Sequence, residues 1–237
     1  MQGAQLRYDH LSKHYGSTIA VRDLSGDIRP GVVTGMLGPN GAGKSTALKC
    51  LLGLAAPTSG SALIDGLPYL QVKQPGRRIG TVLETRGFHP GVTGWQNLLV
   101  LAAAIDVDDS RVNEVLAQVE LTEAADRRIK GYSLGMRQRL SLAAGLLGDP
   151  ETLVLDEPAN GLDPHAIVWL RTLLRSLAAE GRTVLVSSHQ LAEMENTVDD
   201  VFIMDKGYLR AAGSMTEVCA GRTLEQAFLA ITEGGRL

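Results

Sequence analysis

The sequence has 237 residues, which is enough for one large hydrophobic core or for one core with an inserted lobe. Its composition, 44% hydrophobic and 21% charged, is ordinary for a globular protein and too apolar for a disordered one. The formal net charge of -3 excludes a general electrostatic attraction to nucleic acid or to an anionic membrane surface.

The sequence carries no stretch that predicts a membrane span or a signal peptide. The most apolar run, residues 98–105, is far shorter than the roughly 20 residues that cross a bilayer. The start of the chain mixes charged and polar side chains and lacks the apolar stretch of a signal peptide. Two cysteines are too few for a disulfide framework, and Cys50 lies in an apolar run that predicts a buried thiol. We therefore expect a cytoplasmic protein that reaches a membrane only through a partner.

The first third of the chain is predicted to be rich in strands. Alternating or short apolar stretches favour strands over residues 6–15, 20–28, 32–37, 61–64 and 78–83. The first two are expected to pair antiparallel. The run over 32–37 is short and apolar and stops at a glycine, as a buried strand that feeds a loop would, and helical spacing follows over 44–52.

Helical patterns dominate the middle of the chain, and strands alternate with helices after it. Helices are expected over 95–104, 110–121, 134–147, 164–180, 191–198 and 223–231. Strands are expected over 152–155, 183–187 and 201–204. This alternation favours a parallel sheet with helices on both faces. Because similar strand patterns flank the helical middle, residues 85–150 are predicted to form an inserted helical subdomain, with residues 1–84 and 151–237 forming the core.

A glycine-rich segment lies directly between the predicted strand over 32–37 and the predicted helix over 44–52. It fits the pattern G-x-x-x-x-G-K-S/T and comprises Gly38, Pro39, Asn40, Gly41, Ala42, Gly43, Lys44 and Ser45, followed by Thr46. The glycines let the backbone curl so that its N–H groups point at phosphate oxygens, and the helix adds the positive end of its dipole. Lys44 is expected to bind the β- and γ-phosphates, and the Ser45 hydroxyl is expected to bind Mg²⁺. The strand-loop-helix setting argues against a chance glycine-rich turn.

Polar residues end two of the later strands and complete the predicted site. Asp156 and Glu157 follow the strand over 152–155; Asp156 is the expected Mg²⁺ partner and Glu157 is expected to orient the attacking water. His189 follows the strand over 183–187, whose end should meet the same edge of the sheet, and it is a candidate to bind the γ-phosphate. The alternatives are acids that cap the next loop and a histidine with a structural role. With the phosphate loop, these residues indicate a P-loop ATPase.

Further motifs resemble those of the ABC ATPase family. The segment YSLGMRQR over residues 132–139 resembles the family's signature motif, usually L-S-G-G-Q, and NGLD over 160–163 resembles its D-loop. His189 matches the family's switch histidine, and Tyr15 stands where the family stacks an aromatic ring on adenine. The resemblance extends over about residues 6–207, with every motif in the expected order.

This resemblance implies a pair of subunits. Ser133 and the backbone around Gly135 would form a second anion-binding helix N-terminus, which is surplus for one nucleotide already held by a phosphate loop. In the family, two subunits pair head to tail, and each signature helix closes over the ATP of the other. Asp163, in the D-loop, is then expected at the nucleotide as well. The implied partners are a second ATPase subunit, with a homodimer expected, and a membrane permease.

Three positions depart from the family pattern. Glu84 replaces the usual glutamine and could still bind the metal, while Leu134 and Met136 replace a glycine and the glutamine of the signature. The residues at these positions resemble those of the bacitracin- and lantibiotic-exporter branch, whose members are single-domain ATPases that work with a separate permease. In the family, the region that holds Phe88 and Trp95 touches the permease, although both side chains could instead pack the core.

The sequence is thus identified as a member of the ABC ATPase family. We expect a P-loop α/β fold with a mainly parallel core sheet, an N-terminal antiparallel β-subdomain and an inserted helical subdomain. The expected function is hydrolysis of ATP, with Mg²⁺, to drive an exporter from the inner face of the membrane, and no nucleic acid is expected as a partner. The alternatives are a non-transport ABC ATPase that acts on ribosomes or DNA, an importer ATPase, and a P-loop kinase or GTPase.

Overall fold

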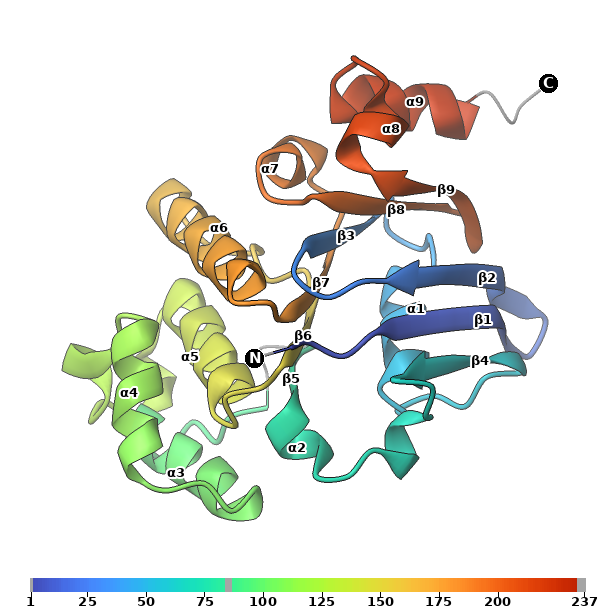
Figure 1. The fold of residues 1–237 in the computed structure, drawn as a ribbon. Helices are drawn as coiled ribbons and strands as arrows, with labels where there is room; N and C mark the ends of the chain where they lie inside the picture. The colour runs from blue at the N-terminus through green and yellow to red at the C-terminus, as the bar shows by residue number, and fades with distance from the viewer. Residues whose placement is uncertain (1, 84–86, 234–237) are drawn as a thin grey trace.

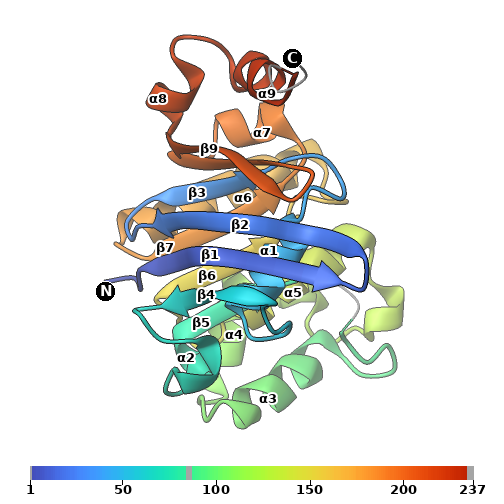
Figure 2. The ribbon, with the colours of Figure 1, turned by 90° about the vertical axis from the view of Figure 1, so that its right-hand side faces the viewer.

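A computed structural model describes residues 2–83 and 87–233 of the chain, in which two sheets lie face to face (Figures 1 and 2). The larger sheet has the strand order β5-β6-β7-β3-β8-β9, and the smaller has the order β2-β1-β4. The strands are β1 (Leu6–Tyr15), β2 (Thr18–Ile28), β3 (Val33–Leu37), β4 (Ser59–Ile64), β5 (Ile79–Val82), β6 (Thr152–Asp156), β7 (Thr183–Ser188), β8 (Asp200–Asp205) and β9 (Tyr208–Ser214). The helices are α1 (Lys44–Leu51), α2 (Pro75–Arg78), α3 (Gly94–Ala104), α4 (Ser110–Gln118), α5 (Leu134–Leu146), α6 (Pro164–Ala179), α7 (Leu191–Glu195), α8 (Met215–Cys219) and α9 (Leu224–Glu233).

The larger sheet is parallel except for its last strand. Strands β5, β6, β7, β3 and β8 run in the same direction, whereas β9 pairs antiparallel with β8. Every residue of β3 and β7 is buried, as expected for strands covered on both faces. The smaller sheet is antiparallel throughout. The predicted α/β architecture, with its antiparallel N-terminal sheet, is therefore confirmed.

Alternate residues of the central strands face two hydrophobic cores. On one face, Met36, Val154 and Leu185 pack with α1 and the smaller sheet. Figure 1 shows α1 between the two sheets. On the other face, Leu155 and Val186 pack with α5 and α6. Successive side chains of a strand point to opposite faces of the sheet, so each short apolar strand contributes residues to both hydrophobic cores.

Helices α3, α4 and α5 gather at one end of the molecule (Figure 1). Leu98, Val115 and Leu140, one from each helix, are fully buried in a common core. Arg139 on α5 joins this group to α6, because its guanidinium lies 4.4 Å from the ring of Trp169 and also donates to the Val119 carbonyl at 2.9 Å. The bounds of the helical subdomain, residues 85–150, remain a prediction. No helix in the described ranges has both the length and the apolarity that a bilayer span requires.

Most expected elements are observed within a few residues of their predicted bounds. The helix expected over 110–121 ends at Gln118, and soon afterwards Glu120 adopts a left-handed backbone with φ 58°. The strand β9 and the short helix α8 were not predicted. β9 is an edge strand with an irregular pattern of burial, so its sequence lacks the clear alternation of a half-buried strand.

Candidate functional site

The carboxyl-terminal ends of β6, β7 and β3 meet at one edge of the sheet. In the register of these parallel strands, Ser187 on β7 lies beside both Asp156 on β6 and Met36 on β3. The backbone N–H of Gly38, which follows β3, donates to the Ser188 carbonyl at 3.3 Å. The phosphate loop, the two acids and the segment before His189 therefore share one edge, as predicted.

The glycine-rich loop curls around the ammonium group of Lys44. This side chain is 95% buried, and its Nζ donates to the carbonyls of Gly38 at 2.7 Å and Pro39 at 3.3 Å. Gly43 has φ 103°, and a Cβ there would overlap the Ala20 carbonyl of the β1–β2 hairpin, so only glycine fits. Among the described residues, no side chain caps the first turn of α1. Its backbone N–H groups therefore suit an anion, and the loop fits the phosphates of a nucleotide.

Among the three predicted catalytic side chains, Glu157 contacts each of the other two. Glu157 follows β6 with a left-handed backbone, φ 51°, which interrupts the alternation of the strand. One of its carboxylate oxygens lies 3.4 Å from Lys44 Nζ, and the other lies 2.8 Å from His189 Nδ1. The Glu157 carboxylate thus lies between the cation of the phosphate loop and the imidazole that follows β7.

The predicted metal ligands are hard oxygen donors. Asp156 ends β6 and accepts a hydrogen bond from the Ser187 hydroxyl, and Ser45 lies in the first turn of α1. Carboxylate and hydroxyl oxygens are the ligands that Mg²⁺ prefers, so the donor set fits this ion. Glu84, the third predicted ligand, lies outside the described residues, and its role stays a prediction.

The aromatic residue expected at adenine lies at the end of β1. The Tyr15 side chain is exposed, and Lys13 Nζ lies 4.8 Å from the centre of its ring. The same hairpin carries Ala20, whose carbonyl lies beside Gly43 of the phosphate loop. The hairpin that presents Tyr15 is therefore in contact with the phosphate loop.

The signature segment and the D-loop lie next to each other and cap two helices. The Ser133 hydroxyl accepts from the N–H of Met136 at the start of α5, and Asp163 caps α6 in the same manner. The Leu134 side chain packs directly against Gly161. Within the described ranges, no hydrogen bond joins Ser133, Gly135 or Asp163 to the phosphate loop, and their role at a nucleotide stays a prediction.

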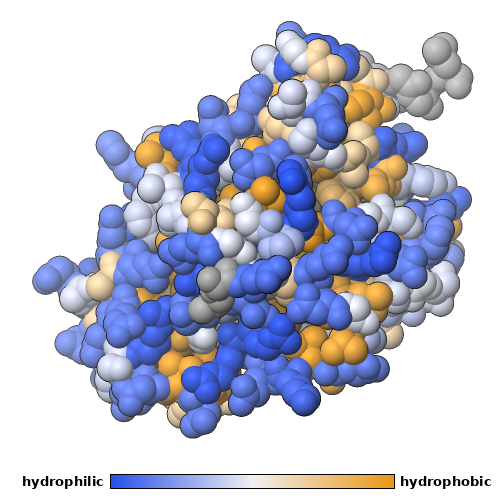
Figure 3. Space-filling model, in the orientation of Figure 1, coloured by the Kyte–Doolittle hydropathy of each residue, from blue (hydrophilic) through white to orange (hydrophobic). Residues whose placement is uncertain are grey.

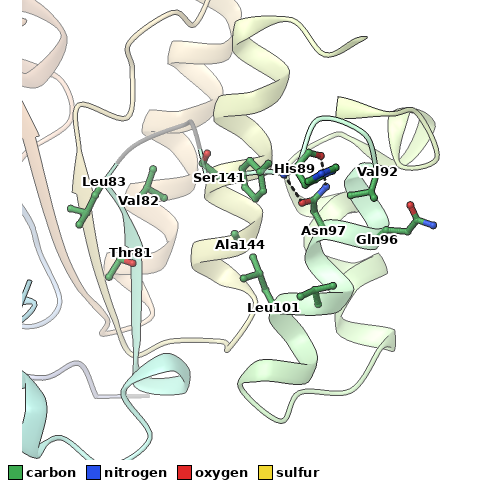
Figure 4. A pocket seen from close by; sticks show the side chains of 13 residues that line it. Thr81, Val82, Leu83, His89, Val92, Gln96, Asn97, Leu101, Ser141 and Ala144 are labelled. Carbon is green, nitrogen blue, oxygen red and sulfur yellow. Dashed lines mark hydrogen bonds between the residues drawn. The ribbon is translucent and has the colours of Figure 1, made fainter. Parts of the chain in front are cut away.

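A cavity of about 600 Å³ opens between the end of β5, α3 and α5 (Figure 4). Phe88 lines this cavity and also packs on the core, and its contact with a permease stays a prediction. The loop before α3 is fixed by Asn97, whose side chain accepts from the His89 N–H at 3.1 Å. Val100 is 69% exposed at the rim, and Figure 3 shows a hydrophobic patch over α3 at the lower edge of the view.

One residue beside the site, Ser187, was not predicted. It is fully buried, and its hydroxyl contacts the Asp156 carboxylate and the backbone N–H of Glu157, which follows β6. The only signal in the sequence is a serine pair just before His189 at the end of a predicted strand.

The chain is similar to ABC transporter proteins in sequence and in fold. Residues 21–160 match the family model described as ABC transporter. The bacitracin transport ATP-binding protein BcrA of Enterococcus faecalis is 39% identical over 213 residues, which cover 89% of this chain and 69% of that protein. The lantibiotic transport ATP-binding protein SrtF of Streptococcus pyogenes is 37% identical over 202 residues, which cover 85% of this chain and 87% of that protein. A solved structure of an ATP-binding subunit of an ABC transporter aligns with a TM-score of 0.87 at 26% identity and covers 96% of this chain and 99% of that chain.

The fold and the phosphate loop together define a P-loop NTPase. More particularly, the chain belongs to the ABC transporter family, as one of its ATP-binding subunits. The predicted resemblance to the bacitracin and lantibiotic branch is confirmed by BcrA and SrtF.

Proposed function

We propose that the chain is the ATP-hydrolysing motor of an exporter, that it pairs with a second copy around two ATP molecules, and that it drives a separate membrane permease. The contact of Glu157 with both Lys44 and His189 is the observation that supports hydrolysis most directly. The names of BcrA and SrtF support transport, with an antibiotic or peptide as the class of cargo.

Each residue of the site has a defined task in this proposal. When ATP binds, the ammonium group of Lys44 leaves the Gly38 carbonyl and the Glu157 carboxylate and binds the β- and γ-phosphates. The backbone N–H groups of the phosphate loop bind the other phosphate oxygens. Ser45 and Asp156 would hold Mg²⁺, which supplies charge neutralisation on the phosphates. Glu157 orients the attacking water and accepts its proton, while His189 holds the Glu157 carboxylate and binds the γ-phosphate.

The second subunit supplies the other side of each ATP site. Ser133 and Asp163 are exposed at the starts of α5 and α6, where a nucleotide held by another copy can reach them. Loss of the γ-phosphate removes these contacts and lets the pair open, which is the mechanical step.

The cavity beside α3 is the proposed contact with the permease. Its lining is mainly apolar and includes Phe88 and Leu101, and the exposed Val100 extends it over the surface. A permease segment bound there would place the chain on the inner face of the membrane. No contact with nucleic acid is proposed.

Hydrolysis is tested by phosphate release from Mg-ATP by the purified chain, with Lys44→Ala and, as a matched control, Lys130→Ala on the exposed surface. The parent and the control should hydrolyse ATP, and the loss of Lys44 should lower the rate by about 100-fold or more. A parent that releases no phosphate from Mg-ATP, or a Lys44 variant of full activity, would refute the proposal.

The permease is tested by affinity capture of the tagged chain from detergent-solubilised native membranes in Mg-ATP. A multi-span membrane protein should be recovered with the parent and with Leu229→Glu, which alters an exposed leucine on α9. Val100→Glu should lose it. Recovery of ribosomal or DNA-repair proteins in place of a membrane protein would overturn the role in transport.

A further inference from the structure

We propose that Ser187 is a positioning residue that holds both acids of the ATPase site and thereby sets the affinity of the site for its divalent cation. This inference rests on the proposed function, because it assigns a role to Asp156 and Glu157 in binding Mg²⁺ and hydrolysing ATP. Among the described residues, the Ser187 side chain makes hydrogen bonds to Asp156 and Glu157 and none to the phosphate loop.

The Ser187 hydroxyl makes one contact to each acid. It donates a hydrogen bond to a carboxylate oxygen of Asp156, and it accepts the backbone N–H of Glu157 at 3.0 Å. The Ser187 carbonyl accepts the same N–H at 3.2 Å. The residue is fully buried, so water does not compete for these bonds, and their loss would leave the polar groups of the acids without this partner.

Each of these bonds constrains an acid that would otherwise have a choice of conformation. A carboxylate can rotate about its last bond, and a donor on one oxygen of Asp156 fixes the plane in which the other oxygen is presented to a cation. Glu157 adopts a left-handed backbone, φ 51°, which is unfavourable for a residue with a side chain. The two hydrogen bonds from its N–H stabilise this backbone conformation and so fix the position from which the Glu157 side chain extends.

The neighbouring residue acts on the phosphate loop in a different manner. The Ser188 carbonyl accepts the N–H of Gly38, a contact made by the backbone and available to any residue at this position. Because β7 lies between β3 and β6, the two serines join the phosphate loop on one side to the acids on the other. Of the two links, only the one through the Ser187 hydroxyl depends on the type of side chain.

The test compares Ser187→Ala with Thr34→Val in the purified chain. Thr34 is a matched control, because its hydroxyl is buried on β3 of the same sheet and has no hydrogen-bond partner among the described residues. Binding of a fluorescent ATP analogue is measured in EDTA and as a function of Mg²⁺ concentration, and thermal unfolding verifies the fold. Ser187→Cys, which fills nearly the same space with a weaker donor, provides a second variant if the alanine variant does not fold.

We expect Ser187→Ala to bind the analogue in EDTA as the parent does. Mg²⁺ should enhance binding of the analogue, and the Mg²⁺ concentration that gives half of this enhancement should rise about 10-fold or more. A loss of this size is usual when the hydrogen-bond partner of a metal ligand is removed. Ser187→Cys should shift in the same direction by less, and Thr34→Val should not shift. An unchanged Mg²⁺ dependence in Ser187→Ala, or an equal loss of affinity in EDTA, would overturn the inference while the proposed function stands. A parent without Mg²⁺-dependent binding would overturn both.

Discussion

Replacement of Glu157 by glutamine should tighten ATP binding while it abolishes turnover. Glu157 and Lys44 are largely shielded from water, with 19% and 5% of their side chains exposed, and lie 3.4 Å apart. ATP must displace this contact before Lys44 can bind phosphate. A hydrogen bond or ion pair to a charged group contributes about 1.5–3 kcal/mol, of which a neutral amide retains part. The substitution therefore removes about 1–2 kcal/mol of competition, which corresponds to about 5- to 30-fold tighter binding.

The loss of turnover follows from the other function of the same carboxylate. A glutamine cannot accept a proton from the attacking water, and positioned general bases contribute about 10²- to 10⁴-fold to a rate. The activation barrier should thus rise by about 3–5 kcal/mol. Because ATP binds and is not consumed, the variant should accumulate as a dimer in Mg-ATP.

Three measurements on the purified variant separate these effects: calorimetric binding of ATP, steady-state phosphate release, and size-exclusion chromatography in Mg-ATP. Glu225→Gln, an exposed acid on α9, is the control and should behave as the parent. Unchanged steady-state hydrolysis in Glu157→Gln would refute the role of this residue. Binding that is unchanged or weaker would refute the competition with Lys44.

Three further outcomes are expected. Tyr132→Phe removes a buried hydroxyl that donates to the Ala124 carbonyl at 2.7 Å, and it should lower the free energy of unfolding in denaturant by about 1–2 kcal/mol; an unchanged midpoint would contradict this. Gly161→Ala places a Cβ at φ 79° against Leu134, and it should cost about 1–3 kcal/mol, partly recovered by Leu134→Ala in a double-mutant cycle; additive effects would exclude the contact. Burial raises the pKa of Cys50, so this thiol should react with iodoacetamide at pH 8 more slowly than the same thiol in the unfolded chain. Because the folded protein keeps the proton of Cys50 longer than the unfolded chain does, the free energy of unfolding should fall as pH rises past the ordinary pKa of a thiol.

Much of the site could be predicted because its parts are short and contiguous. The strand-loop-helix pattern around Lys44 identifies the phosphate loop without further context. The ends of parallel strands lie at one edge, which is why Glu157 and His189 could be expected near it from their positions alone. Most strands and helices could be predicted for the same reason, because each is marked by an alternating or apolar run in its own segment of the sequence.

The contacts that could not be predicted depend on the register of distant segments. The role of Ser187 requires β6 and β7 to pair so that residue 187 lies beside residue 156, and a shift of one residue would turn its hydroxyl to the other face. The contact of Leu134 with Gly161 depends on how α5 and the D-loop pack. The edge strand β9 was missed because only its pairing with β8 defines it.

The close packing of Leu134 on Gly161 has an evolutionary consequence. A side chain at position 161 would meet the exposed Leu134 side chain and would also have to adopt a left-handed backbone, so with leucine at 134 it needs both a shift of that leucine and a strained φ. A lineage with the family's usual glycine at 134 lacks the contact with leucine but keeps the left-handed backbone at 161. Both effects favour glycine at 161, so an ancestral reconstruction of the branch should find Leu134 only in backgrounds where residue 161 was already glycine.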